Sequence, residues 1–423
     1  MYEYINMDMN MGMDMNMNIR RSIGMENVNL YAFFFIVFVT IMILFYGYVK
    51  VKYRFWSIQP VFHAYNILYW MRPPGLIENR FPKKNKFVNT RDIFFRDFST
   101  VSKDTIQESV SLIQNHYLKL KDAHYYPEES NFIPYFRGHN DPSFLSTYFY
   151  QDHLKNKEII GTMTTRPLSI RLFNKQTKIY YVDHLCVHGG YRNKGYAPEL
   201  IQTHNYHQCH ANPKIMCSLF KKETDLTGIV PLTIYTTYGF NITTWKQNYR
   251  LHSSIQLLEV SKKNIHILHE FLREMMLKED KFSCFIMPSI GNIQSLIETQ
   301  NIFVYMGMQN GNVLSTYFFR RSCLTYQEKK GSIECFCTIQ NMEHKQREDM
   351  LFVYMFSEAL KRVIRREKKY SIHYLLLENN SDTKEILINI RLKYEPEFES
   401  PTAYYLYNYG VRPIEEFRVC IIN

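Results

Sequence analysis

The residues that point most directly to a chemical function form a basic, glycine-containing loop between a predicted strand and a predicted helix. The loop is Arg192–Ala197, with the pattern R-x-x-G-x-A. The N–H groups at the start of a helix carry a positive partial charge, which favours a phosphate or pyrophosphate. Gly195 lets the backbone approach such an anion closely, and Arg192 and Lys194 add full positive charges. The pattern predicts a phosphate-binding loop; an ordinary basic turn before a helix is the alternative.

Hydrophobic periodicity predicts the elements that would hold this loop in place. Residues 178–187 read as a strand that leads into the loop, and residues 197–208 follow it as a helix. The other predicted elements are a helix at 105–120, strands at 158–163 and 169–173, a hairpin of 302–309 and 313–319 about Asn310-Gly311, a helix at 346–368 and a strand at 372–377. This alternation predicts an α/β fold, most economically as two halves, 50–248 and 249–423.

The composition is that of a folded chain with an anionic partner. Of the 423 residues, 46% are hydrophobic and 22% are charged, so neither a disordered nor a collagen-like protein is expected. The eight cysteines include no C-x-x-C pair, which argues against a zinc ribbon or disulfide scaffold and favours reduced cytosolic thiols. The net charge of +11 suits nucleic acid, a membrane surface or a phosphorylated small molecule, and composition does not choose among them.

The N-terminal part of the chain predicts a membrane anchor. Residues 1–29 are a low-complexity arm rich in Met, Asn and Asp, which we expect to be disordered. Residues 30–49 carry no charge and would span ~30 Å as a helix, the thickness of a bilayer core. Arg20 and Arg21 precede the span and Lys50, Lys52 and Arg54 follow it, and this slight excess of positive charge after the span predicts that the large C-terminal part faces the cytosol. We predict a single-pass membrane protein; a buried core helix is the alternative.

Beyond these patterns, the chain resembles a known family. An R-x-x-G-x-A loop after a strand is the acyl-CoA signature of the GNAT acetyltransferase superfamily, and the longer string His184–Ile201 (HLCVHGGYRNKGYAPELI) is similar to its N-myristoyltransferase branch. Tyr53–Val61 (YRFWSIQPV), Leu375–Asn379 (LLLEN) and Tyr404–Tyr409 (YYLYNY) resemble further motifs of that branch, in the same order. The resemblance covers about 53–423. It implies tandem GNAT-like halves around a mixed, saddle-shaped sheet, preceded here by one transmembrane helix.

The resemblance also implies a site for acyl-CoA as co-substrate, with myristoyl-CoA favoured, acetyl-CoA possible and no metal. It places the lining of that site at Arg54, Phe55, Trp56, His184, Leu185, Cys186 and Val187, and the phosphate and pantetheine contacts at Asn193, Gly195, Tyr196 and Ala197, beside Arg192 and Lys194. The family's oxyanion hole uses two backbone N–H groups, which correspond here to His184 and Leu185. The family has Phe where this chain has His184, but a backbone donor does not depend on the side chain.

The family's general base is the carboxylate of the last residue, which the resemblance places on Asn423. The tail Phe417–Asn423 is largely apolar, as a base held inside the protein requires. The alternative is a C-terminal strand that only completes a sheet, which would have the same apolar sequence. Asp183 and His184 are alternative bases of the ordinary acid–base kind.

Two other features are weaker guides to function. Histidines at 204, 207 and 210, with Cys209, could bind a metal, but a helix after a CoA loop needs none, and we predict a solvated polar face. The family's acidic loop should follow Tyr117, and Leu118–His124 contains one acid, Asp122. The resemblance therefore says less about the acceptor than about acyl-CoA.

The expected function is transfer of a fatty acyl group from CoA to the N-terminal glycine amine of a protein or peptide, by direct attack on the thioester. The expected partners are acyl-CoA, that acceptor and a membrane, with no nucleic acid. One alternative is a GNAT acetyltransferase that uses acetyl-CoA on a small amine or lysine. Another is an inactive homologue that retains the fold and binds acyl-CoA.

Overall fold

The computed structural model describes residues 30–118, 123–151, 157–223, 228–243, 245, 251–326, 330–341 and 349–423. The chain forms two compact units, Met1–Gln59 and Pro60–Asn423, which we describe separately. The predicted disordered arm at 1–29 and the predicted boundary at 248 lie outside the described residues. The division into halves at that boundary therefore stays a prediction.

The first unit contains one long apolar helix. It runs from Leu30 to Lys52, over 23 residues, and its most apolar 18-residue stretch has a mean hydropathy of 2.4, so its length and composition would allow it to cross a membrane. The predicted span at 30–49 lies within it. An N-terminal signal sequence has the same properties, so the helix is a candidate for either role. The short 3-10 helix η1 (Trp56–Ile58) follows.

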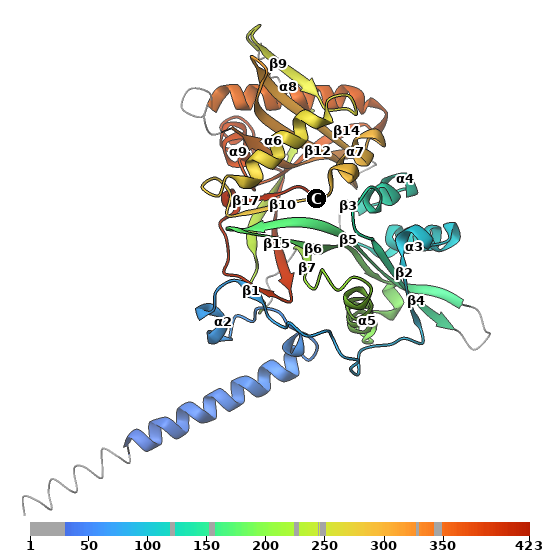
Figure 1. Ribbon diagram of the computed structural model, residues 1–423, viewed down its shortest axis with the longest axis vertical. Coiled ribbons are helices and arrows are strands. Elements are labelled where there is room, and N and C mark those ends of the chain that lie inside the picture. Colours follow the sequence, from blue (N-terminus) through green and yellow to red (C-terminus); the bar gives the residue numbers. More distant parts are fainter. Residues whose placement is uncertain are drawn as a thin grey trace, which may run out of the picture. The chain divides into compact units, whose positions relative to one another are not determined.

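The second unit is built on one large mixed sheet (Figure 1). In spatial order its strands are β17 (Val419–Ile421), β10 (Cys284–Met287), β5 (Lys157–Leu172), β6 (Lys175–Val187), β7 (Ser218–Glu223), β15 (Phe398–Tyr407), β8 (Thr233–Asn241), β14 (Ile372–Glu378), β13 (Lys330–Gln340), β12 (Asn312–Tyr326), β11 (Ile302–Gln309) and β9 (Ile255–Glu259). Beside this path, β4 (Phe144–Gln151) pairs with β5 and with β2 (Ile93–Asp97), and β3 (Ala123–Tyr125) pairs with β12. A separate small sheet joins β1 (Gly75–Leu76) to β16 (Tyr409–Gly410).

One arrangement occurs twice in this sheet. β5 and β6 form an antiparallel hairpin, helix α5 (Tyr196–Ala211) follows, and β7 returns parallel to β6. β12 and β13 form a second antiparallel hairpin, followed by α8 (Asp349–Arg366) and the parallel strand β14. Each hairpin has an irregular register near its middle, after Thr164 and after Phe318. The predicted mixed α/β fold with two similar halves is confirmed.

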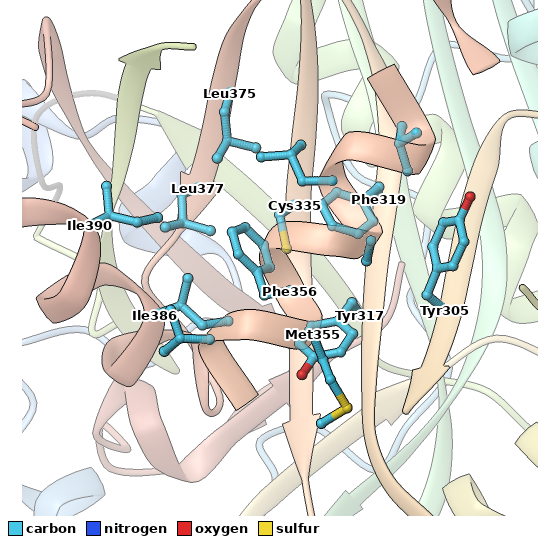
Figure 2. Close-up of a cluster of buried hydrophobic side chains, with 14 of the residues drawn as sticks. Tyr305, Tyr317, Phe319, Cys335, Met355, Phe356, Leu375, Leu377, Ile386 and Ile390 are labelled. Atoms are coloured by element: carbon cyan, nitrogen blue, oxygen red, sulfur yellow. The ribbon is translucent and has the colours of Figure 1, made fainter. Parts of the chain in front are cut away.

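Helices cover each half of the sheet. α5 contacts β2, β4, β5 and β6, and α3 (Lys103–His116) contacts β5 and β6. In the second half α8 contacts β9, β11 and β12, and α9 (Thr383–Arg391) contacts β13 and β14. Figure 2 shows the core that results, where Phe356 of α8 and Ile386 of α9 meet Cys335 and Leu377 of the sheet. The remaining helices are α2 (Ile67–Met71), α4 (Glu129–Phe132), α6 (Ile265–Leu277), α7 (Ile290–Glu298) and the 3-10 helices η2 (Phe98–Thr100), η3 (Ile133–Phe136), η4 (Gly189–Tyr191), η6 (Lys368–Tyr370) and η7 (Glu416–Arg418).

One predicted break is absent. The sequence predicted separate strands at 158–163 and 169–173, but the structure has the single strand β5, which continues through Pro167 although proline has no N–H to donate. β4 pairs with β5 only as far as Thr165, and β10 begins to pair at Ser169. Pro167 therefore lies in the gap between those two neighbours, where β5 has a partner strand on one edge only.

The predicted hairpin about Asn310-Gly311 is confirmed. Asn310 and Gly311 have φ of 50° and 84°, the left-handed values that a two-residue hairpin turn requires. The predicted helices and the strand at 372–377 are also present, with shifted ends: α3, α5, α8 and β14. Residues 346–348, the predicted start of the helix that became α8, lie outside the described residues.

Candidate active site

The loop Arg192–Ala197 follows a place where two parallel strands separate. β6 pairs with β7 from Tyr180, opposite Ser218, to Val182, opposite Phe220, although β6 itself continues to Val187. Beyond Val182, no described strand pairs with that edge of β6. An extended ligand can take the place of the missing strand there, because its polar groups can bond the backbone.

The start of α5 lies directly after this open edge. Gly195 precedes the helix with φ +93°, a left-handed conformation that favours glycine. A Cβ at Gly195 would meet no atom within 4 Å, so the space around it is open. No side chain caps the N-terminus of α5. The N–H groups of the first turn, at Tyr196 and Ala197, are thus disposed to bind an anion.

The two basic residues of the loop differ in their contacts. Arg192 Nε donates to the Val187 carbonyl at 3.3 Å, and its Nη2 donates to the His116 carbonyl at the end of α3. Lys194 is exposed, and its Nζ lies 5.3 Å from the centre of the Tyr191 ring. Both keep positive charge at the loop, but Arg192 also ties the loop to the elements around it. The sequence did not indicate that second role.

The strand before the loop has a bulge at Asp183. Thr164 is opposite His184 and Thr165 is opposite Val182, so Asp183 is the extra residue on β6. The His184 backbone N–H donates to Thr164 Oγ1 at 3.2 Å. To act as an oxyanion donor, the His184 N–H would have to give up its hydrogen bond to Thr164 Oγ1 and donate to the substrate oxygen instead.

The two alternative bases are poorly suited to accept a proton from an amine. His184 lies 3.3 Å from Tyr125 OH through Nε2 and 3.3 Å from Thr164 Oγ1 through Nδ1, and burial, with a smaller effect of Arg166, lowers its pKa to about 3. Arg166 Nε donates to both carboxylate oxygens of Asp183, at 2.9 and 3.0 Å. Burial raises the pKa of Asp183, and Arg166 offsets part of that rise. One group is thus a weak base and the other is held in an ion pair.

The last residue of the chain is buried. β17 pairs in parallel with β10, and alternate residues of β17 pack into two different hydrophobic clusters. The Ile422 N–H donates to the Ile286 carbonyl at 2.8 Å, which continues the pairing to the next residue. Asn423 itself is 3% exposed. Figure 1 marks this end of the chain with C, near the labels of β10 and β5.

An arginine and a tyrosine hold Asn423. Arg320 Nη1 donates to the main-chain oxygen of Asn423 at 3.3 Å and to its Oδ1 at 3.2 Å, and Asn423 Nδ2 donates to Tyr404 OH at 2.9 Å. Glu334, opposite Arg320 on the neighbouring strand, accepts from Arg320 Nε at 2.7 Å and from Nη2 at 2.9 Å. This bidentate pair fixes the plane of the guanidinium, so its third nitrogen is aimed at Asn423.

A second carboxylate lies against the same arginine. Glu378 accepts from Lys221 at 2.8 Å and from Tyr235 OH at 2.9 Å, and lies 3.5 Å from Arg320. Burial would raise the pKa of Glu334, but Arg320 outweighs it and holds that pKa well below its ordinary value. Burial raises the pKa of Glu378, and Glu334 adds to the rise. The sequence pattern did not predict this cluster; the signal that it offered was Glu334, the one acid within the largely apolar strand β13.

Contacts connect the end of the chain to the bulge. The Tyr404 ring, which bonds Asn423, lies 6.3 Å from the Tyr181 ring. The Arg166 guanidinium lies 5.3 Å from the Tyr181 ring and binds Asp183. A series of side-chain contacts through Tyr404, Tyr181 and Arg166 thus links Asn423 to Asp183, the bulge residue that precedes His184.

The other predicted lining residues lie on different sides of β6 or in the first unit. Cys186 is buried, and its Sγ is 3.7 Å from the Leu112 carbonyl of α3, whereas Leu185 packs with the cluster around Leu200 of α5. Val187 is buried. Arg54, Phe55 and Trp56 belong to the first unit, where the Phe55 and Trp56 rings are 5.1 Å apart.

The histidines of α5 do not form a solvated face. His204 is 1% exposed, with Nδ1 at 2.8 Å from Ser146 Oγ and Nε2 at 2.9 Å from Thr165 Oγ1. The prediction of a solvated face is therefore wrong at His204, because that side of α5 packs on β4 and β5; it holds at His210, which is exposed. Within the described part of the chain, no three or more His, Cys, Asp or Glu residues are grouped as metal ligands.

His204 should make the protein sensitive to acid. Burial lowers its pKa from 6.5 to about 3, so the unfolded chain binds a proton between those values and the folded chain does not. Stability is then lost as pH falls below about 6.5, by up to about 1.4 kcal/mol per pH unit. We expect His204→Gln to flatten the dependence of the unfolding free energy on pH between about 6 and 4. His210→Gln, at an exposed site, is the control, and an equal effect of both changes would contradict the assignment.

The comparisons with known proteins agree with this geometry. Residues 81–230 match the family described as myristoyl-CoA:protein N-myristoyltransferase, N-terminal domain. Among solved structures, Saccharomyces cerevisiae N-myristoyltransferase with bound myristoyl-CoA is 15% identical, with 88% of this chain and 99% of that chain covered and a TM-score of 0.64. The same yeast enzyme with myristoyl-CoA and inhibitors gives 13% identity, 87% and 95% coverage and a TM-score of 0.66.

A second type of solved structure shares the tandem arrangement. A tandem GNAT protein from the clavulanic acid biosynthesis pathway is 10% identical, covers 76% of this chain and 100% of its own, and has a TM-score of 0.51. No curated protein sequence matches this chain. The structural matches support the fold, and the family match adds the sequence of residues 81–230, which includes the bulge, the loop and α5.

Proposed function

We propose that the chain is a membrane-anchored N-acyltransferase of the N-myristoyltransferase type, which transfers a fatty acyl group from CoA to an N-terminal glycine amine; the family match over residues 81–230 and the shared fold support this. The observation that carries the proposal is the open edge of β6 beyond Val182, which leads to the uncapped N-terminus of α5. An edge that can bond an extended amide chain, followed by an anion site, matches the pantetheine and pyrophosphate of an acyl-CoA.

In this proposal each part of acyl-CoA meets a named part of the chain. Pantetheine lies along the open edge at His184–Val187, and the pyrophosphate binds the loop Asn193–Ala197, with Arg192 and Lys194 adding charge. The aromatic segment Arg54–Trp56 lines the acyl group. That segment begins two residues after the apolar helix ends at Lys52. If the helix spans a membrane, the acyl group would be taken up, or the product released, close to the lipid headgroups.

The chemistry is direct attack of the amine on the thioester. The nitrogen forms a bond to the acyl carbon, the carbon–sulfur bond breaks, and CoA leaves as its thiol. An N-terminal amine has a pKa of about 7.7–8.0, so a base must take its proton at neutral pH. We assign that base to the carboxylate of Asn423 and the oxyanion hole to the backbone N–H groups of His184 and Leu185. The buried, clamped position of Asn423 supports this, as does the poor fit of Asp183 and His184 to the task.

The test is an acyl-transfer assay on the full chain in detergent, read by mass spectrometry of the acceptor peptide. A peptide with a free N-terminal glycine should gain one myristoyl group from myristoyl-CoA, and the same peptide with an acetylated N-terminus should gain none. Faster acetyl transfer from acetyl-CoA would favour the acetyltransferase alternative. Binding of both CoA esters without transfer would favour an inactive homologue.

A further inference from the structure

The short helix α2 exposes an unusual concentration of apolar side chains. Within its five residues, Ile67, Leu68 and Met71 are 71%, 62% and 76% exposed, and Trp70 is 37% exposed. Leu76 and Phe81 follow as further exposed apolar residues. Elsewhere in the described part of the second unit, large exposed apolar side chains occur mostly singly. A cluster of exposed apolar side chains of this kind is typical of a surface that binds another protein or a membrane.

α2 is nevertheless firmly attached to its unit. The rings of Tyr69 and Trp70 lie 5.7 and 4.9 Å from the ring of buried Phe62. Trp70 Nε1 donates to the Ala64 carbonyl at 3.1 Å, and Arg412 Nε donates to the Trp70 carbonyl at 3.0 Å. These contacts use one side of the helix and leave Ile67, Leu68 and Met71 directed outward. The exposure is thus a fixed feature of the surface.

Two exposed arginines lie at the end of α2. Arg72 follows the helix and is exposed, and the exposed Arg412 lies against its last turn. Further along the chain, between residues 73 and 91, the one acid is Glu78 and the exposed basic residues include Arg80, Lys83, Lys84 and Lys86, of which Lys84 lies 5.9 Å from the Tyr206 ring of α5. Apolar side chains with an indole and a basic margin are the composition of a segment that lies at a membrane interface.

We propose that α2 is a second membrane contact, with Ile67, Leu68 and Met71 inserted at the headgroup level of an anionic bilayer. The choice of a bilayer follows from charge complementarity and from chain connectivity. The candidate membrane helix ends at Lys52, and Ile67 is 15 residues further on, a reach of at most about 50 Å. The inference rests on the proposed membrane anchoring and adds a surface contact that orients the enzyme on the lipid.

The experiment uses the full chain in lipid particles that contain anionic lipid, with an environment-sensitive fluorophore on one cysteine. Seven of the native cysteines are buried, and Cys323, which is partly exposed, is replaced by Ser. The label is placed by Leu68→Cys in α2, by Leu392→Cys as a control at another exposed leucine, and by Phe38→Cys in the apolar helix. We expect headgroup nitroxides to quench the label at 68, mid-chain nitroxides to quench the label at 38, and neither to quench the label at 392.

Each outcome decides the proposal. Loss of the quenching at 68 in an Arg72→Glu, Arg412→Glu background would support the role of charge. A label at 68 that iodide quenches from water, while the label at 38 is quenched by lipid, would overturn the α2 contact and leave the span in place. Protection at 68 from both iodide and lipid nitroxide would overturn it in favour of a protein surface. An unquenched label at 38 would remove the proposed anchoring, and the inference with it.

Discussion

A short glycine tail added after Asn423 is expected to lower acyl transfer by about two orders of magnitude or more, the scale of a lost general base, while acyl-CoA binding is retained. The tail replaces the terminal carboxylate with an amide, which cannot accept the proton of the amine. The loop Arg192–Ala197 should be undisturbed, because the hydrogen bonds that hold Asn423 come from Arg320 and Tyr404, outside the loop. Single-turnover transfer and equilibrium binding of myristoyl-CoA measure the two effects separately.

The matched control for this change is Tyr404→Phe. It removes the hydroxyl that accepts from Asn423 Nδ2 but leaves the carboxylate and the two bonds from Arg320. We expect a much smaller loss of transfer than in the extended protein. Thermal unfolding of both variants checks that β17 stays in the sheet. Full transfer by the extended protein would discard the terminal base and return the role to Asp183 or His184.

The parts of the site that the sequence predicted are those that depend on neighbouring residues. The strand–loop–helix order around Arg192–Ala197 is visible locally, because a glycine before a helix and charges beside it are adjacent in the chain. The hairpin at Asn310-Gly311 is equally local, since its φ values depend on those two residues. Family resemblance extended this reading to Asn423, whose burial in the structure is consistent with it.

The parts that the sequence did not predict depend on residues that only the fold brings together. Arg320 and Glu334 belong to the strands β12 and β13 and Asn423 follows β17, so no local pattern relates the three residues. The continuity of β5 through Pro167 was missed because it depends on where β4 and β10 end. The burial of His204 was missed because hydroxyls of Ser146 and Thr165, on two other strands, satisfy both of its nitrogens. In each case a contact between distant segments overrode a local preference.

Gly195→Asp is expected to weaken acyl-CoA binding by at least about 100-fold, the equivalent of about 2.8 kcal/mol. A carboxylate at the N-terminus of α5 would stand where the pyrophosphate binds, and opposing like charges costs several kcal/mol. The change also strains the backbone, since Gly195 has φ +93°. Isothermal titration with myristoyl-CoA and with free CoA measures the effect, and both should weaken, because both carry the pyrophosphate.

Gly311→Asp separates the two causes. Gly311 has φ +84°, and a Cβ there would also meet no atom within 4 Å, so the same substitution brings similar strain and the same charge to a hairpin turn outside the proposed site. We expect it to lower stability about as much as Gly195→Asp and to leave the affinity for CoA unchanged. If both variants lost affinity equally, strain would be the cause; if neither did, the pyrophosphate does not meet the loop. If the pyrophosphate binds the N-terminus of α5, only Gly195→Asp should lose affinity for CoA. That loss of affinity should become smaller at high salt, because salt screens the added charge.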